Sequence, residues 1–248
     1  MMESFKRYFN WRGTQRDLNA LAEWAQRRGH GFKRARGDHG FVMDGELDGR
    51  TWRLEWGPPQ RAYLDGPELR VRMEMGVSNE LQMLVLTLPL MDRLERQAYE
   101  EFTDPVQTQI GTNAPEEMRW LVMFPKINLT DLGSLKQHFG AVASVPTVGL
   151  AWIEGQLAAA LALAAKSWLT PQQPLVLMTL RGRLYLRTLS PEPSVQDVSH
   201  ALSLFTTAAH QVLRVVGEVG DGSGHAHSGA TTAWQTIAPD SSSEPPKR

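Results

Sequence analysis

The stretch DGELDGRTWRLE, residues 44–55, carries oxygen-bearing side chains at the spacing of a calcium-binding loop. Asp44, Glu46 and Asp48 take loop positions 1, 3 and 5, a glycine takes position 6, and Glu55 takes position 12. Such a loop must curl between two helices so that its oxygens converge on the ion. Calcium binding is therefore the first hypothesis to weigh.

The same segment also alternates between apolar and polar residues, which is typical of a β-strand. Asp48-Gly49 is a favoured two-residue turn, and folding the chain there pairs residues whose numbers sum to 97. This register gathers nearly every apolar side chain on one face and lays Trp52 over Gly45. Asp44 and Glu46 then point away from that face. We therefore interpret the segment as a β-hairpin and predict no calcium site.

Two further groups have side chains that could do chemistry. Asp197, His200 and Ser203 lie three residues apart on one predicted helix. A catalytic serine instead sits on a strained turn beside an oxyanion hole, with its acid and base brought from elsewhere, so we interpret the three as a polar helix face. His225 and His227 form an isolated pair without further ligands nearby. The sequence predicts no catalytic residue, no metal site and no cofactor.

A basic cluster over residues 27–36 is the best candidate for anion binding. Its members are Arg27, Arg28, Lys33, Arg34 and Arg36. Arginines 53, 70 and 72 could extend it from the outer face of the predicted sheet, but five acids share that face, so its sum is not positive. A solvated, salt-bridged surface is the main interpretation, and anion or nucleic-acid binding is the alternative.

Composition narrows the function classes. The 248 residues include 26 Lys and Arg against 27 Asp and Glu, so attraction to nucleic acid or an anionic membrane is not built into the whole molecule. The absence of cysteine excludes disulfides, thiolate metal sites and cysteine nucleophiles. The N-terminal residues lack the apolar core of a signal peptide, and polar residues interrupt the alanine-rich segment 148–169. We expect a soluble, cytoplasmic protein with no membrane partner.

The periodicity predicts an α+β fold: an antiparallel β-meander covered by helices, a second β-hairpin, a long C-terminal helix and a disordered C-terminal tail. Helices are predicted over 14–28, 91–102, 113–125, 129–140, 148–169 and 194–216. Strands are predicted within 40–76 and 81–88, and the second hairpin over 174–189 turns at Arg181-Gly182 through two or three residues. Residues 47–54 and 180–187 share a short motif, which leaves an internal duplication open.

Three regions follow. Residues 1–90 hold the first helix and the meander, and residues 91–217 hold the helical segment, second hairpin and closing helix, either separately or as one domain with the first. Residues 218–248 are predicted to be a disordered tail, in which Trp234 and Ile237 are a candidate docking motif. The favoured function is a non-catalytic interaction module whose partner is another protein. The alternatives are an anion or nucleic-acid binder and an enzyme whose site is assembled from distant residues.

Overall fold

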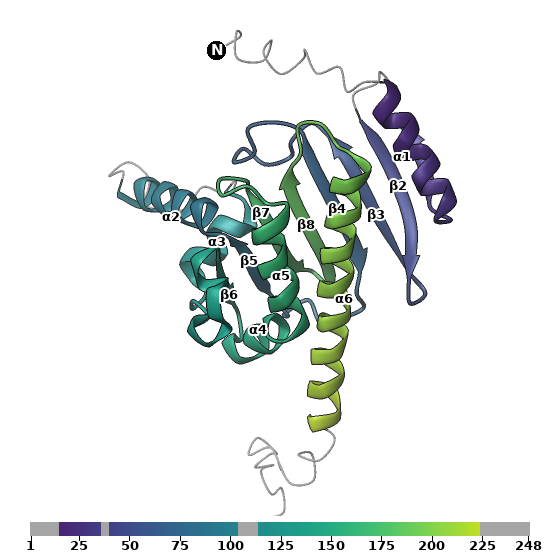
Figure 1. The fold of residues 1–248 in the computed structure, drawn as a ribbon. Helices are drawn as coiled ribbons and strands as arrows, with labels where there is room; N and C mark the ends of the chain where they lie inside the picture. Colours follow the sequence, from purple (N-terminus) through teal and green to yellow (C-terminus); the bar gives the residue numbers. More distant parts are fainter. Residues whose placement is uncertain (1–14, 36–39, 104–113, 224–248) are drawn as a thin grey trace, which may run out of the picture.

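The computed structural model describes residues 15–35, 40–103 and 114–223, and Figure 1 draws the other segments in grey. The described residues form one eight-stranded antiparallel sheet with helices on both faces, which confirms the predicted α+β class. The strands are β1 (Gly31–Arg34), β2 (Phe41–Leu47), β3 (Arg50–Gly57), β4 (Glu68–Glu74), β5 (Met83–Thr87), β6 (Phe139–Ala143), β7 (Leu175–Leu180) and β8 (Arg183–Leu189). The helices are α1 (Gln15–Arg27), α2 (Leu88–Thr103), α3 (Glu116–Met123), the 3-10 helix η2 (Thr130–Gln137), α4 (Pro146–Ile153), α5 (Gln156–Ser167) and α6 (Val195–Ser223).

The strand order across the sheet is β1-β2-β3-β4-β8-β7-β5-β6. The predicted meander therefore holds through β4, whereas β5 lies farther along the sheet, between β7 and β6. The second hairpin, β7 with β8, occupies the middle. Because β8 pairs with β4, strands from residues 1–90 and from residues 91–217 share one sheet.

The β2–β3 hairpin has the register that the sequence predicts, with Phe41 opposite Trp56 and Gly45 opposite Trp52. A Cβ atom at Gly45 would lie 2.1 Å from a ring atom of Trp52, so the indole covers the bare backbone and no side chain fits there. The hairpin interpretation of residues 44–55 is therefore confirmed.

Both hairpins close through the same kind of two-residue turn. Asp48 and Gly49 have φ angles of 50° and 73°, and Arg181 and Gly182 have 51° and 75°. Positive φ at both central residues is what a type I′ turn requires. The motif shared by the two segments follows from this common turn and does not need a duplication to explain it.

Different helices cover the two faces of the sheet (Figure 1). Helices α1, α4, α5 and α6 pack on one face and bury the main hydrophobic core. Helices α2 and α3 pack on the other face, over β5 and β6, where they bury a second, smaller core around Leu94 and Trp120. Among the described residues no helix covers this second face over β2, β3 and β4.

Two strands were not predicted. The sequence predicts a helix over 129–140 that ends at Gly140, but the structure has η2, interrupted by Gly133 at a φ of 63°, and then β6. Every residue of β6 is buried. A short apolar run of this kind fits a buried strand or a buried helix equally well, so periodicity does not separate them. The other missed strand, β1, is only four residues long.

The predicted single helix over 148–169 is instead two helices, α4 and α5, that meet at 63°. The break falls at Gly155, whose φ of 74° is not helical. Within the described ranges no single helix is long and apolar enough to cross a membrane. Helices α4 and α5 taken together reach the length and apolar composition of a membrane span, but the pair is bent.

Helix α6 extends beyond its predicted end. Its apolar stripe, including Val198, Phe205 and Val212, is buried as predicted. The helix continues to Ser223. Residues 224–248 lie outside the described residues, and with them the candidate motif of Trp234 and Ile237 and the histidine pair at 225 and 227.

Candidate binding surface

Polar side chains from neighbouring strands form the uncovered part of the second sheet face. Side chains alternate between faces along a strand, so strand pairing decides which residues stand together. One row runs across Asp44, Arg53, Arg72 and Tyr185, and the next across Val42, Glu55, Arg70 and Arg187. We call this surface the open face. Its charged members are Lys33, Asp44, Glu46, Arg53, Glu55, Glu68, Arg70, Arg72, Glu74, Arg183 and Arg187.

The open face carries six cations and five acids. The expectation that the sum of its charges is not positive is therefore wrong. That expectation placed three arginines against five acids, whereas β8 adds Arg183 and Arg187 and β1 adds Lys33. In the sequence, β8 lies far from both β3 and β4, and β1 precedes β2, the first strand of the hairpin.

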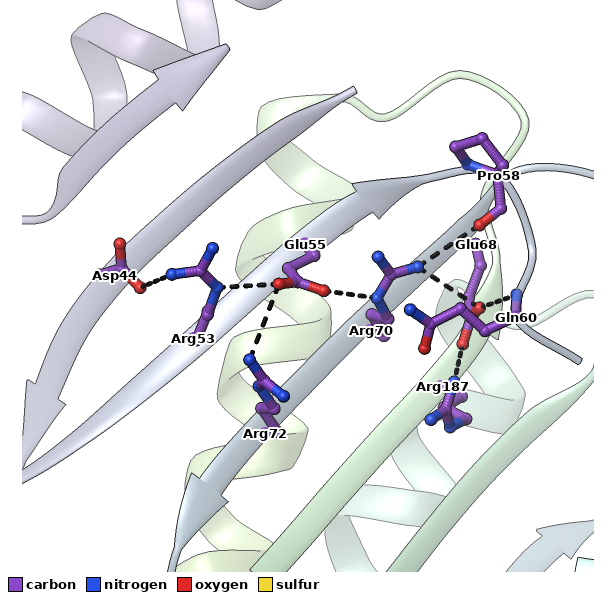
Figure 2. Close-up of polar contacts among 9 residues, drawn as sticks. All are labelled: Asp44, Arg53, Glu55, Pro58, Gln60, Glu68, Arg70, Arg72 and Arg187. Atoms are coloured by element: carbon purple, nitrogen blue, oxygen red, sulfur yellow. Dashed lines mark hydrogen bonds and ion pairs between the residues drawn. The ribbon is translucent and has the colours of Figure 1, made fainter. Parts of the chain in front are cut away.

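Glu55 holds the centre of the network (Figure 2). Its carboxylate accepts hydrogen bonds from Nε of Arg53 at 2.8 Å and from Nε of Arg70 at 2.6 Å, and Arg72 lies 3.9 Å away. Burial acts to raise the pKa of Glu55, but the hydrogen bonds from the two arginines prevail, so its pKa lies below 4.5. Glu55 is therefore a carboxylate at neutral pH.

Two pairs of arginines stand directly opposite each other on adjacent strands. Arg53 on β3 faces Arg72 on β4, and Arg70 on β4 faces Arg187 on β8. Like charges in this position destabilise an antiparallel pair. Glu55 lies within ion-pair distance of both arginines of the first pair and of Arg70 in the second. Glu68 lies within ion-pair distance of both arginines of the second pair. The two carboxylates therefore offset the like charges.

The arginines differ in exposure. The side chains of Arg53, Arg72 and Arg183 are 42%, 50% and 45% exposed, whereas those of Arg70 and Arg187 are 19% and 8% exposed. The three exposed arginines line a shallow depression of about 350 Å³. A guanidinium group presents planar donors that match a carboxylate or a phosphate. Acidic side chains line the depression too, and each of the three arginines already lies within ion-pair distance of a carboxylate. An anionic ligand would share these guanidinium groups with them.

A buried carboxylate anchors the end of this surface that lies beside the loop after β3. Glu68 is fully buried; it pairs with Arg187 and accepts a hydrogen bond from the backbone N–H of Gln60 at 2.8 Å (Figure 2). Arg70 lies 3.7 Å from the same carboxylate. These contacts tie β4, β8 and the loop after β3 together, so they hold the exposed arginines on a rigid base.

The loop between β3 and β4 has a second anchor on α3. Glu117 is fully buried and accepts hydrogen bonds from Arg61 Nε at 3.1 Å and from the Tyr63 hydroxyl at 2.9 Å. Burial, together with the adjacent Glu117 carboxylate, raises the pKa of Tyr63 well above 10, so the hydroxyl stays protonated and donates. The sequence shows Glu116-Glu117 only as an adjacent acidic pair. The structure makes Glu117 a structural acceptor.

The low pKa of Glu55 predicts a pH-dependent stability. A carboxyl group whose pKa is lower in the folded state stabilises the fold above its unfolded-state pKa, here near 4.5, and loses that contribution as the pH falls through the folded value. We expect Glu55→Gln to be less stable than the wild type at neutral pH, and the gap to narrow below pH 4.5. Urea unfolding at a series of pH values measures this. A gap that stays constant from neutral to acid pH would show that Glu55 contributes nothing through its charge.

The structure divides the predicted basic cluster between surfaces. Lys33 lies on the open face, opposite Val42, whereas Arg34 lies on the other face and donates to the side chain of Asn19 on α1. Arg27 and Arg28 lie at the end of α1, where Arg28 stacks over the ring of Trp24 at 4.9 Å. Arg36 lies outside the described residues. The cluster is not one continuous patch on one face.

Two of the three polar residues of α6 have other contacts, and the third, Ser203, is exposed. Asp197 accepts hydrogen bonds from the backbone N–H and the hydroxyl of Ser194, as a helix cap does. His200 stacks on Trp168, with ring centroids 5.7 Å apart. In the part of the chain that the structure describes, no three His, Asp or Glu side chains are grouped so that they could hold a metal.

A local pattern in the sequence could have identified the residues of β8 that belong to the open face. In RGRLYLRT, residues 181–188, alternation places Arg183, Tyr185 and Arg187 on one strand face. What the sequence could not supply is the pairing of β8 with β4, which brings that face beside Arg70 and Arg72. A comparison of the chain with protein families, characterised proteins and solved structures finds no match.

Proposed function

We propose that this protein is a non-catalytic interaction module whose open face binds the anionic groups of another protein. The observation that carries the proposal is the two cross-strand arginine pairs, Arg53 with Arg72 and Arg70 with Arg187. A sheet face that served stability alone would favour opposite charges or β-branched residues at such positions. Glu55 and Glu68 offset the two pairs. Residues that break a local rule and need such compensation are typical of functional surfaces.

The chemistry of the surface favours acidic side chains as its ligands. The guanidinium groups of Arg53, Arg72 and Arg183 are about half exposed and are held by carboxylates of the same sheet, so little side-chain entropy is lost when they bind further carboxylates. Asp44 and Glu74, which line the same depression, would select against a partner with uniformly dense negative charge. This argues for a protein over nucleic acid.

A second candidate partner is nucleic acid, because Lys33 extends the open face toward the basic cluster. Because Arg27, Arg28 and Arg34 do not lie on that face, nucleic acid is the weaker candidate. The proposal includes a cytoplasmic location, which fractionation of the source cells would test.

We expect the double variant Arg72→Gln/Arg183→Gln to lose its partner while keeping its fold. Each charge-assisted hydrogen bond contributes about 1.5–3 kcal/mol, so the captured partner should fall by at least about tenfold. The Arg72 change also removes one like-charge pair, and the loss of this pair should not lower the midpoint temperature of unfolding. The measurement is affinity capture from a lysate of the source cells, with nuclease treatment, followed by quantitative mass spectrometry.

The matched control is Lys136→Gln/Lys166→Gln, which removes the same charge from exposed positions on η2 and α5, away from the open face and from β1. It should capture as much partner as the wild type. Equal capture by wild type, test variant and control would contradict the proposal. Loss of all captured protein on nuclease treatment would instead support the nucleic-acid candidate.

A further inference from the structure

The two edges of the sheet end differently. At the β6 edge, the backbone N–H of Ile127 donates to the carbonyl of Ala141 at 2.9 Å, and Lys126 forms an isolated bridge with Val142. A segment of the chain therefore covers that edge. At the opposite edge, β1 pairs with β2 on one side, and no other described residue pairs with it on the other side.

The hydrogen-bond pattern shows which backbone groups of β1 face outward. The N–H of Ala35 donates to the carbonyl of Gly40 at 2.9 Å, so these two residues form a hydrogen-bonded pair. Such pairs alternate with non-hydrogen-bonded pairs in an antiparallel ladder. Lys33 with Val42 is therefore of the bonded type, and the N–H and C=O groups of Phe32 and Arg34 point away from β2.

The surroundings of this edge are cationic. Lys33 and Arg34 belong to β1, and Arg27 and Arg28 end the helix that leads into it. Helix α1 carries two exposed acids, Asp17 and Glu23, and Asp44, opposite Gly31, is paired with Arg53. These three acids do not balance the four cations.

We propose that β1 is a strand-addition site for an extended, acidic segment of a partner protein. Main-chain hydrogen bonds to Phe32 and Arg34 would hold the added strand, and its Asp or Glu side chains would pair with the flanking cations. A second copy of this chain does not fit, because pairing two β1 strands would bring both sets of cations together. The site is separate from the exposed arginines of the proposed function, so either can fail without the other.

The first test uses a capped peptide of alternating Glu and Val as the probe, with the full-length protein. NMR hydrogen exchange should show the amides of Phe32 and Arg34 exchanging fast in the free protein and slowly with peptide bound. The amide of Lys33, which bonds to β2, should be protected in both. An otherwise identical peptide with lysine in place of glutamate should bind at least about tenfold more weakly, because like charges face it.

A pair of variants isolates the backbone contribution. Arg34→Pro removes an outward N–H without breaking a bond to β2, and proline is tolerated on edge strands in such positions. Arg34→Ala removes the same side chain but keeps the N–H. We expect the alanine variant to bind the peptide more weakly and the proline variant to lose it. A probe methylated at alternate backbone nitrogens tests the same bonds without altering the protein, should the proline variant fail to fold.

Three results would overturn the proposal. The acidic peptide could fail to bind at millimolar concentration, or it could bind without protecting Phe32 and Arg34. The third is protection of those amides in the free protein as its concentration rises, together with a dimer in light scattering, which would make a second copy the occupant.

Discussion

Glu68→Ala is expected to lower the free energy of unfolding by about 3–5 kcal/mol, which is the cost of removing one partner from a buried ion pair. The substitution leaves the Arg187 side chain, only 8% exposed, beside Arg70 without its carboxylate. It also removes the acceptor for the backbone N–H of Gln60. Urea unfolding with the midpoint and slope fitted separately measures the loss.

Two further variants make this test specific. Asp44→Ala removes an exposed ion pair of 3.5 Å with Arg53 and should cost no more than about 1 kcal/mol. The double variant Glu68→Leu/Arg187→Met replaces both buried charges by apolar groups and should recover most of the stability that Glu68→Ala loses. A loss below about 1 kcal/mol for Glu68→Ala would show that the buried pair does not support the open face.

Trp152→Ala has the other large expected effect, also about 3–5 kcal/mol, because it leaves a cavity where an indole is fully buried. Trp152 lies on α4, and its Nε1–H donates to the carbonyl of Ala208 on α6 at 3.1 Å. Helix α6 in turn packs against β4 and β8, which carry most arginines of the open face. The substitution should therefore loosen the layer that backs this surface.

Differential scanning calorimetry or urea unfolding checks the Trp152 prediction. Leu163→Ala is the matched control on the neighbouring helix α5, where the side chain is 65% exposed, and it should change stability by no more than about 0.5 kcal/mol. Trp152→Phe keeps a ring but loses the donor and some volume, so its cost should fall between the two. Equal midpoints for Trp152→Ala and the wild type would contradict the assigned role of α4 in the core.

The parts of the fold that depend on local signals could be predicted from the sequence. The β2–β3 register follows from the Asp48-Gly49 turn and the alternation on either side of it, and each is encoded within a few residues. The ends of α1 and the apolar stripe of α6 follow from periodicity and from Gly29 at a φ of 73°.

The parts that depend on distant pairing could not be predicted. No local sequence pattern indicates that β8 lies beside β4, yet this pairing brings the polar sides of the two strands together in the open face. For the same reason, local pattern makes Glu68 an exposed residue of a polar strand face, whereas Arg187 from the other half of the chain covers it. The break at Gly155 was hidden because helices also tolerate glycine.

The most direct test of the open face as a binding surface is arginine-selective chemical footprinting of the captured complex. Phenylglyoxal modification, followed by peptide mass spectrometry, compares each arginine in the free protein and in the complex. We predict that Arg72 and Arg183 react in the free protein and are protected in the complex, while Arg96, which is exposed on α2, reacts equally in both. Protection confined to Arg27 and Arg28, or no change at Arg72 and Arg183, would contradict the proposed binding surface.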